Sequence, residues 1–270
     1  MVATSLGNPG DLSQRAREAL SEADIVLAED TRRAGLLCQR HALSVRRFVS
    51  FHEHNEEERS LEALAWLREG QRLALISDAG LPVVADPGYR LVRLCRQAGM
   101  AVSVVPGPCA PVTALAGSGI APLPFSFLGF LPRDSAGRKK LFEAFAQVPG
   151  SLVFFERKDR LSKSLDEAHA LLGDRELCIA RELTKTHEEF IISSLAEHRA
   201  CSSGLLGELT LVLGPRLELS KSPESEALDL LREEQARGGR PRELVRRAQE
   251  RLRGWTGSEL YALLLRQGKI

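Results

Sequence analysis

The sequence predicts an α/β protein built from two α/β domains and a small helical domain at the C-terminal end. Short apolar runs alternate with helical patterns from residue 25 to residue 213, which favours parallel or mixed sheets covered by helices. Gly and Pro cluster at residues 117–132 and again at 214–223, and three further helical patterns follow the second cluster. We therefore expect domains at 1–118, 119–217 and 218–270.

Each expected strand is a short apolar run rich in Val, Ile, Leu or Phe, and most of these runs end at Gly, Pro or an acidic residue. The expected strands are 25–28, 47–51, 72–77, 101–105, 126–129, 152–156, 177–180 and 209–213. Helices are expected after polar residues that can cap them, at Ser13, Asn55 and Asp159. In the C-terminal part the expected helices are 224–237, 241–252 and 258–267, with glycines between them.

Composition places the chain among globular proteins. Of 270 residues, 43% are hydrophobic and 27% are charged, and no apolar run approaches the roughly 20 residues that a membrane-spanning helix needs. The first residues lack the basic and apolar regions of a signal peptide. The five cysteines are scattered without a C-x-x-C pair, so neither a disulfide framework nor a metal site is expected. We expect a cytoplasmic protein that does not bind a membrane.

Basic residues gather at two places, although the formal net charge is only +1. Residues 237–253 contain seven arginines and two glutamates, and Arg133, Arg138, Lys139 and Lys140 form a smaller patch. Such patches neutralise the phosphates of nucleic acids. A solvated helix face gives the same pattern, so the charges alone leave both interpretations open.

Four loops rich in Gly, Pro and acidic residues follow expected strands in the first half of the chain. They are residues 4–11, 29–32, 77–88 and 106–110. Ligands bind at the carboxyl ends of strands in open α/β sheets, so four such loops together indicate a ligand cleft, although each alone could be an ordinary turn. No G-x-G-x-x-G follows a strand and no P-loop sequence is present, which disfavours a Rossmann dinucleotide site and a P-loop.

These loops, in this order, resemble the ribosomal RNA small subunit methyltransferase I family, which belongs to the tetrapyrrole-methylase fold group. The resemblance runs from residue 2 to about residue 213, with a weak match at Leu260-Tyr261. Its specific parts are the run from Ser77 to Gly88 and the run Arg181-Glu182-Leu183-Thr184-Lys185. Weaker parts are Thr4, Gly7-Asn8, Asp11, Glu29-Asp30-Thr31-Arg32, Phe51-His52-Glu53-His54-Asn55-Glu56, Pro106-Gly107-Pro108, Gly129-Phe130-Leu131-Pro132 and Phe155-Glu156.

The resemblance implies two α/β domains with S-adenosylmethionine bound in the cleft between them, in a homodimer. It also implies the reaction, which is 2′-O-methylation of a cytidine ribose in the 16S rRNA of the small ribosomal subunit. The sequence departs from the family's pattern at several positions. The first strand is cut to residues 2–4. This chain has Ser5-Leu6 where the family has Pro-Ile, Leu81 where it commonly has Thr, Arg157 where it commonly has Ser, and Leu206 where it usually has Lys.

Methyl transfer to a ribose hydroxyl requires the oxygen, the methyl group and the sulfur to be aligned, and it is helped by a group that takes the hydroxyl proton. The candidates for that group are Asp78, Glu182 and Lys185. Glu29, Asp30 and Arg32 are expected to organise the cleft. The expected cofactor contacts are Gly80, Pro82, Asp86, Gly107, Pro108, Thr184 and Glu208. The expected RNA contacts are Arg138, Lys139, Lys140, Arg240, Arg242, Arg246 and Arg247.

Two other functions remain open at this stage. One is methylation of a small tetrapyrrole, because the fold group includes such enzymes; the basic tail and the run from Glu29 to Arg32 argue against it. The other is a catalytically silent RNA-binding or ribosome-assembly factor, against which the intact acidic loops argue. Binding of S-adenosylmethionine separates a silent factor from an enzyme.

Overall fold

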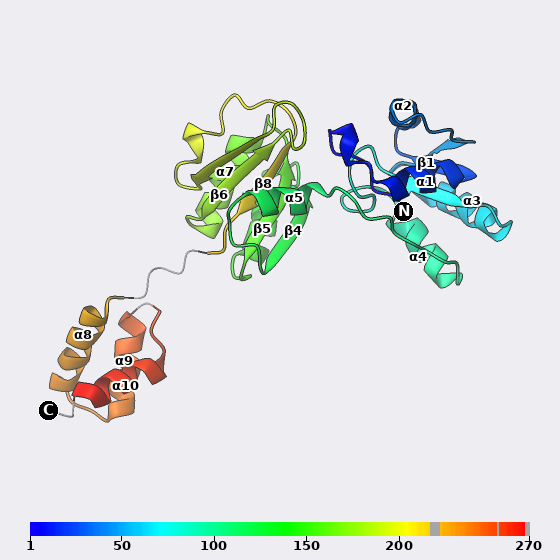
Figure 1. The fold of residues 1–270 in the computed structure, drawn as a ribbon. Helices are drawn as coiled ribbons and strands as arrows, with labels where there is room; N and C mark the ends of the chain where they lie inside the picture. The colour runs from blue at the N-terminus through cyan, green and yellow to red at the C-terminus, as the bar shows by residue number, and fades with distance from the viewer. Residues whose placement is uncertain (217–221, 253, 268–270) are drawn as a thin grey trace. The chain divides into compact units, whose positions relative to one another are not determined.

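The computed structural model describes residues 1–216, 222–252 and 254–267. Contacts divide the chain into two compact units, Met1–Pro215 and Arg216–Ile270. Among the described residues, the first unit contains two sheets with their helices and the second contains three helices (Figure 1). The expected boundary at residues 217 and 218 lies outside the described residues.

The first sheet consists of three parallel strands in the order β2-β1-β3. They are β1 (Ile25–Ala28), β2 (Phe48–Ser50) and β3 (Leu73–Ile76). The first residues of the chain run beside β3, because the backbone N–H of Val2 donates to the carbonyl of Leu75 at 2.9 Å. Val2 also forms an isolated parallel bridge with Val105. Residues 101–105 were expected to form a strand, but among the described residues this single bridge is their only strand pairing.

Both faces of this sheet are covered, which explains why its central strand is a continuous apolar run. The flanking elements are η1 (Pro9–Asp11), α1 (Gln14–Glu22), α2 (Thr31–Arg40), α3 (Glu56–Arg68) and α4 (Tyr89–Gln97). Val26 faces a core shared with α1 and α2, whereas its neighbour Leu27 faces a core shared with α3 and α4. The Ser13 side chain caps α1 as expected, by accepting a hydrogen bond from the N–H of Ala16.

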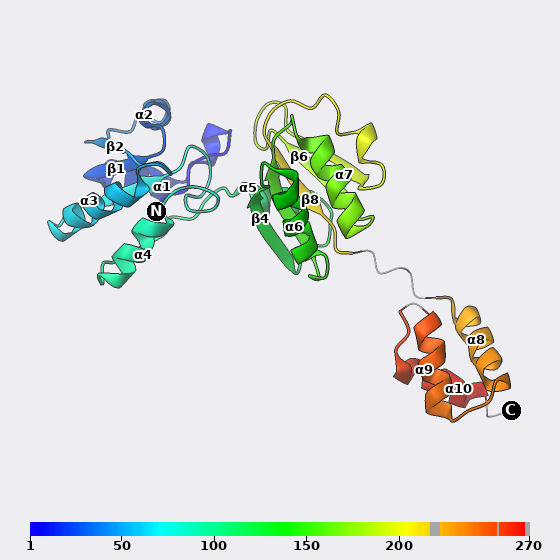
Figure 2. The ribbon, with the colours of Figure 1, turned by 180° about the vertical axis from the view of Figure 1, so that it is seen from behind.

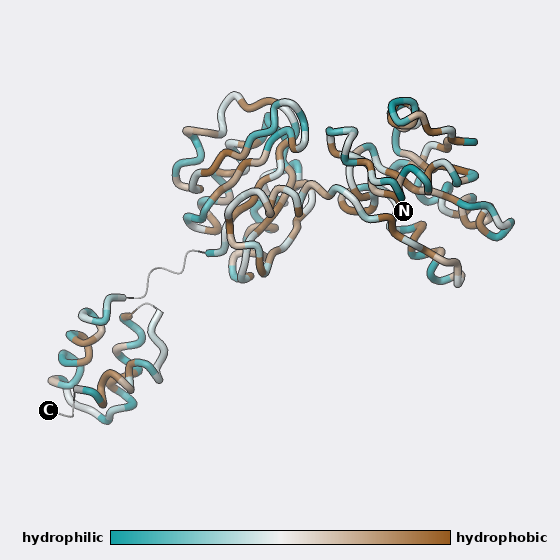
Figure 3. Tube along the Cα trace, viewed as in Figure 1, coloured by the Kyte–Doolittle hydropathy of each residue, from teal (hydrophilic) through white to brown (hydrophobic). Residues whose placement is uncertain are grey.

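The second sheet is mixed and has the strand order β4-β5-β8-β6-β7. Its strands are β4 (Phe125–Phe130), β5 (Ser151–Glu156), β6 (Glu176–Arg181), β7 (Glu189–Ser194) and β8 (Leu209–Leu213). Only the β4–β5 pair is parallel. Four of these strands were predicted from the sequence, and β7 was missed. Apolar residues follow the strands of this sheet (Figure 3).

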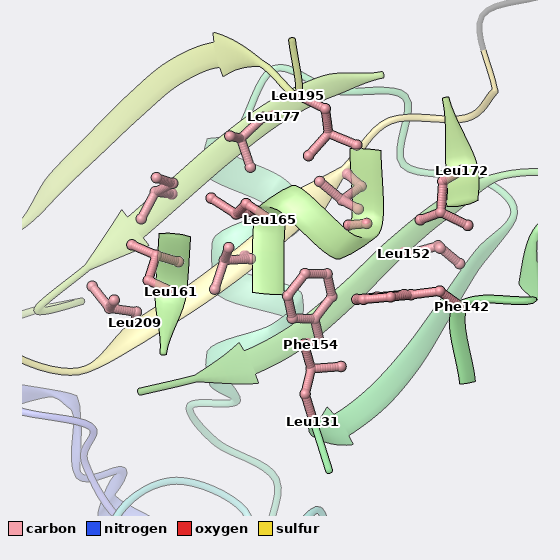
Figure 4. Packing of buried hydrophobic residues seen from close by; sticks show 14 residues of the cluster. Leu131, Phe142, Leu152, Phe154, Leu161, Leu165, Leu172, Leu177, Leu195 and Leu209 are labelled. Carbon is pink, nitrogen blue, oxygen red and sulfur yellow. The ribbon is translucent and has the colours of Figure 1, made fainter. Parts of the chain in front are cut away.

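Residues alternate between two cores across the second sheet. The helices are α5 (Ala110–Gly117), α6 (Ser135–Phe145), α7 (Leu161–Leu172) and the short η2 (His198–Ala200). Phe142 of α6 meets Phe154 of β5 edge to face, with ring centroids 6.1 Å apart, and Leu165 of α7 joins the same core (Figure 4). Figure 2 shows α6 and α7 on this second-sheet lobe from behind.

Helix α5 covers the opposite face of the second sheet. Its Ala114 and Leu115 pack against Val153 of β5 and Val212 of β8. The expected first boundary, after residue 118, groups this helix with the first sheet instead. We therefore propose that the first lobe ends just before α5 begins at Ala110.

The second unit is a three-helix cluster made of α8 (Glu224–Ala236), α9 (Pro241–Arg251) and α10 (Gly257–Gln267). The three expected helices agree with these bounds within one residue at each end. Leu231, Ala248 and Leu260 are buried in its core, one from each helix. No helix in the described ranges is long and apolar enough to cross a membrane.

Arg138 is buried, which corrects one expected RNA contact. Its guanidinium donates from Nε to Oε2 of Glu167 at 2.7 Å and from Nη2 to Oε1 at 3.0 Å, so the pair is bidentate. The two side chains are 2% and 9% exposed and join α6 to α7. The remaining nitrogen donates to the carbonyls of Pro132 and Arg133. Arg138 is therefore a structural residue that phosphates cannot reach, whereas Lys139 and Lys140 are exposed.

Arg138→Ala is expected to lower the free energy of unfolding by about 3–5 kcal/mol, because it leaves the buried carboxylate of Glu167 without its cation. Urea denaturation followed by circular dichroism at pH 7 measures the loss. Lys139→Ala is the control, since this exposed neighbour is expected to change stability by less than about 0.5 kcal/mol. Equal effects of the two substitutions would contradict the structural role of Arg138.

Candidate active site

A cleft of about 500 Å³ lies at the carboxyl ends of β3 and β5, within the first unit. Its apolar walls include Leu6, Leu81, Phe130, Phe155 and Leu209, with the rings of Phe130 and Phe155 5.0 Å apart. Its acidic residues are Asp78, Asp86, Glu156, Asp159 and Glu208. The position agrees with the rule that ligands bind outside the carboxyl ends of strands in α/β sheets.

The loop after β3 is held in a strained conformation. Val83 and Ala85 have φ angles of 78° and 68°, in a left-handed region that residues other than glycine rarely occupy. At Gly88, with φ of 129°, an added Cβ would lie 2.5 Å from a methyl carbon of Leu75. The N–H of Gly88 donates to the carboxylate of Glu56 at 2.9 Å, which anchors the end of the loop to α3. Residues in such conformations cost about 1–3 kcal/mol each and cluster at functional sites.

Asp78 ties this loop to the loop after β1. One of its carboxylate oxygens accepts a hydrogen bond from the N–H of Asp30 at 3.2 Å, and the other accepts from the Arg33 guanidinium at 2.9 Å. Asp30 caps α2 and binds the side chain of Arg32, whose hydrogen bond lowers the pKa of Asp30 to about 2. Asp30 and Arg32 therefore lie at the N-terminal end of α2, and neither residue lines the cleft.

Two cleft-side carboxyl groups have raised pKa values. Burial raises the pKa of Asp86 to about 6; the charges of Glu29 and Asp78 add to this effect, and a hydrogen bond from Ser77 opposes it. Burial also raises the pKa of Glu29, and the charge of Asp78 adds to that shift. Perturbed carboxyl groups that line a cleft are typical of functional sites.

Lys185 lies between two carboxylates in the loops that follow β6 and precede β8. Its Nζ donates to Glu182 and to Glu208, at 3.0 Å in each case. Burial alone would lower the pKa of Lys185, but these hydrogen bonds raise it above the ordinary value. The pKa of Glu182 is lowered, mainly by a hydrogen bond from the N–H of Glu208 and then by Lys185. Lys185 therefore keeps its proton at neutral pH, which makes it unsuitable as a proton acceptor.

The first loop of the chain contacts this lysine loop. The N–H of Asn8 donates to the hydroxyl of Thr184 at 3.0 Å. At Gly7 an added Cβ would lie only 2.3 Å from Cγ of Lys185, so the lysine stem occupies the space that any other residue at this position would need. Glu182 and Thr184 have φ angles of 49° and 64°, so this second loop is strained as well.

The cleft lining includes four of the expected catalytic or cofactor residues, namely Asp78, Gly80, Asp86 and Glu208. The others lie around it rather than in its lining. They are Glu29, Asp30, Arg32, Pro82, Gly107, Pro108, Thr184, Glu182 and Lys185. Sequence reasoning did not propose Phe130, Phe155 or Glu156 as site residues, although all three fall in quoted motifs at strand ends. No cluster of three or more metal-ligating side chains occurs in the described part of the chain.

A profile of the tetrapyrrole (corrin/porphyrin) methylases matches residues 1–198. The chain belongs to this family. Proteins named ribosomal RNA small subunit methyltransferase I are similar to it, which confirms the resemblance found in the sequence. The Escherichia coli relative is 47% identical over 70% of this chain and 66% of its own length. The relative from Micromonospora olivasterospora is 39% identical over 100% and 88%, and that from Thermotoga maritima is 41% identical over 79% and 96%.

Solved structures of a tetrapyrrole methylase and of diphthine synthase share the fold. A uroporphyrin-III C-methyltransferase from Thermus thermophilus, crystallised with S-adenosylhomocysteine, has a TM-score of 0.56 at 20% identity and covers 79% of this chain and 95% of its own. Diphthine synthase has a TM-score of 0.61 at 15% identity and covers 79% and 88%. This member of the tetrapyrrole methylase family is a methyltransferase, and S-adenosylmethionine is its methyl donor.

The cleft fits that cofactor. Its volume lies within the roughly 300–1,000 Å³ of small-molecule sites, and its aromatic wall suits a flat purine. Its carboxylates suit the positive charges of a sulfonium and an amino group. Gly80 has φ of 79°, and an added Cβ would lie 3.3 Å from the carbonyl oxygen of Pro108, so only glycine lets these two backbones approach so closely without strain.

Gly7→Ala is expected to lower the free energy of unfolding by about 1–3 kcal/mol, because the new methyl group must displace the stem of Lys185 from between its two carboxylates. Gly35→Ala is the matched control. It lies in α2 with nothing within 4 Å of an added Cβ, so it is expected to raise stability by about 0.5–1 kcal/mol. Thermal denaturation distinguishes the two directions, and a stabilising Gly7→Ala would contradict the packing described.

Proposed function

We propose that this methyltransferase transfers the methyl group of S-adenosylmethionine to the ribose 2′-hydroxyl of a cytidine in 16S rRNA of the small ribosomal subunit. The observation that carries the proposal is its 39–47% identity to relatives named for that rRNA subunit. The acidic cleft and the exposed basic residues of the second unit support it. A protein with this substrate acts in the cytoplasm, and we propose that location as well.

The residues of the cleft have separable roles in this reaction. The bound cofactor supplies the reactive methyl group, and the protein must orient the two reactants and exclude water. The aromatic pair Phe130 and Phe155 holds the flat part of the donor. Asp78 fixes the wall by joining the loops after β1 and β3. Lys185 keeps Glu182 and Glu208 in place at the opposite wall.

The six described arginines between residues 237 and 251 fall into two groups. Arg237, Arg247 and Arg251 bind the carboxylate of Glu234, which is 1% exposed, so they stabilise the helix cluster. This pairing assigns Arg247 a structural role rather than the RNA contact expected from the sequence. Arg240, Arg242 and Arg246 are exposed and have no ion pair among the described residues, which makes them suited to phosphates. Arg253 lies outside the described residues.

A homodimer forms part of the proposal. Strand β7 lies at an edge of the described second sheet, and its Ile192 is 60% exposed. An unpaired strand edge with an exposed apolar side chain is a surface that proteins commonly cover.

Lys139 and Lys140, exposed on α6, remain proposed RNA contacts.

Transfer of labelled methyl groups to unmodified small ribosomal subunits tests the proposed function. Label is expected on a single cytidine ribose of 16S rRNA, located by nuclease digestion and mass spectrometry. Cofactor binding without label on the subunit would refute the rRNA substrate and favour a small-molecule acceptor. Failure to bind the cofactor as well would leave a silent assembly factor.

Replacing Arg240, Arg242 and Arg246 together by Gln is expected to weaken binding to small subunits and to reduce its salt dependence. Each lost phosphate contact removes about 0.7–0.9 from the slope of log K against log salt concentration. The matched control replaces Arg40, Arg68 and Arg93, three exposed arginines of the first unit, and is expected to keep the slope. Equal slopes for the two triple variants would contradict the RNA role of the tail.

A further inference from the structure

Five carboxylates line the cleft, and four of them are bound to a cation. Asp78 binds Arg33, Asp159 binds Arg157, and Glu208 binds Lys185. Glu156 binds Arg160 and also accepts hydrogen bonds from the Ser164 hydroxyl and from a backbone N–H. Asp86 is the fifth, and no cation pairs with it among the described residues.

Asp86 is held in place by its backbone and by a hydrogen bond from Ser77 rather than by an ion pair. It follows Ala85, whose φ is 68°, and it precedes the anchored Gly88 in the strained loop after β3. The charges that act on it are those of Glu29, after β1, and of Asp78, after β3, whose partner is Arg33. Apart from Arg33, which Asp78 already engages, these neighbours are acidic.

We propose that Asp86 is the catalytic residue that takes the proton from the ribose hydroxyl during methyl transfer, in a role that rests on the proposed function. The hydroxyl O–H bond breaks, and its proton passes to the Asp86 carboxylate. The ribose oxygen forms a bond to the methyl carbon while the bond from that carbon to sulfur breaks. The electron pair of the broken bond stays on sulfur, and the protonated carboxyl group later returns its proton to water.

The properties of Asp86 suit this step better than those of the three acceptors expected from the sequence. A proton acceptor works best when its pKa lies near the working pH and when it has a free lone pair. Burial and acidic neighbours raise the pKa of Asp86 to about 6, so it is ionised at neutral pH but more basic than an ordinary carboxylate. Lys185 is already protonated, and both oxygens of Asp78 accept hydrogen bonds. Glu182 accepts two hydrogen bonds at Oε1, and its pKa is lowered rather than raised.

Asp86→Asn tests the assignment in the full-length chain. The unsubstituted protein is expected to show a turnover rate on small subunits that rises up to tenfold per pH unit below about pH 6 and then levels off. The variant is expected to lose about 100-fold or more in turnover and to lose this pH dependence, while its affinity for S-adenosylhomocysteine changes less than about threefold. Asp174→Asn, at an exposed position near the start of β6, is the matched control.

Stability supplies a second readout that does not depend on activity. Because folding raises the pKa of Asp86 from 3.8 to about 6, its contribution to stability is full below pH 3.8 and is lost as the pH rises through 6. Asp86→Asn is therefore expected to melt at a higher temperature than the unsubstituted chain at pH 7.5, with little difference at pH 4.5. Asp86→Glu, which keeps a carboxylate, is expected to recover part of the turnover.

The outcomes separate the two proposals. An unsubstituted chain that binds the cofactor but labels no rRNA refutes the proposed function. Labelling by the unsubstituted chain, together with near-normal turnover and an intact pH dependence in Asp86→Asn, refutes only the role of Asp86. A variant that loses cofactor affinity in parallel with turnover shows that Asp86 binds the cofactor and overturns its assignment as proton acceptor.

Discussion

The cleft depends on the carboxylate of Asp78 more than on any other single group. Its two oxygens join the loop after β1 to the loop after β3, through the N–H of Asp30 and the guanidinium of Arg33. Two parallel strands bring these loops to the same edge of the sheet, but the strands do not set the distance between the loops. The hydrogen bonds of Asp78 set that distance. The strained segment with Val83 and Ala85 comes after Asp78 in the same loop, and Ala85 lines the cleft.

Strand and helix positions could be predicted because burial leaves a direct periodic pattern in the sequence. The exceptions have physical causes. Strand β7 pairs on one side only among the described strands and exposes Ile192, so its apolar pattern is weak. Residues 101–105 read as a strand, but their partner is only the short segment beside Val2, and pairing is limited to one bridge.

The loops of the site could be recognised from their motifs, whereas the state of each side chain could not. The partners that decide it come from distant parts of the chain. Arg138 looks like any surface arginine until Glu167 is seen 2.7 Å away, and Lys185 looks like a free base until it is found between two carboxylates. Asp86 differs from the other four carboxylates that line the cleft because it lacks such a cation partner among the described residues. Pairings between distant residues leave no local pattern in a single sequence.

The strand order of the second sheet has a consequence for the making of the protein. Strand β8 is the last strand of the first unit along the chain, yet it lies between β5 and β6. During synthesis, β5 and β6 therefore emerge from the ribosome before the strand that joins them. Their inward edges stay unpaired until Leu213 has left the exit tunnel, whereas the first sheet has all its strands by residue 76. The nascent second sheet thus exposes unpaired strand edges that are prone to aggregation. Chaperone binding protects the chain most during this part of translation.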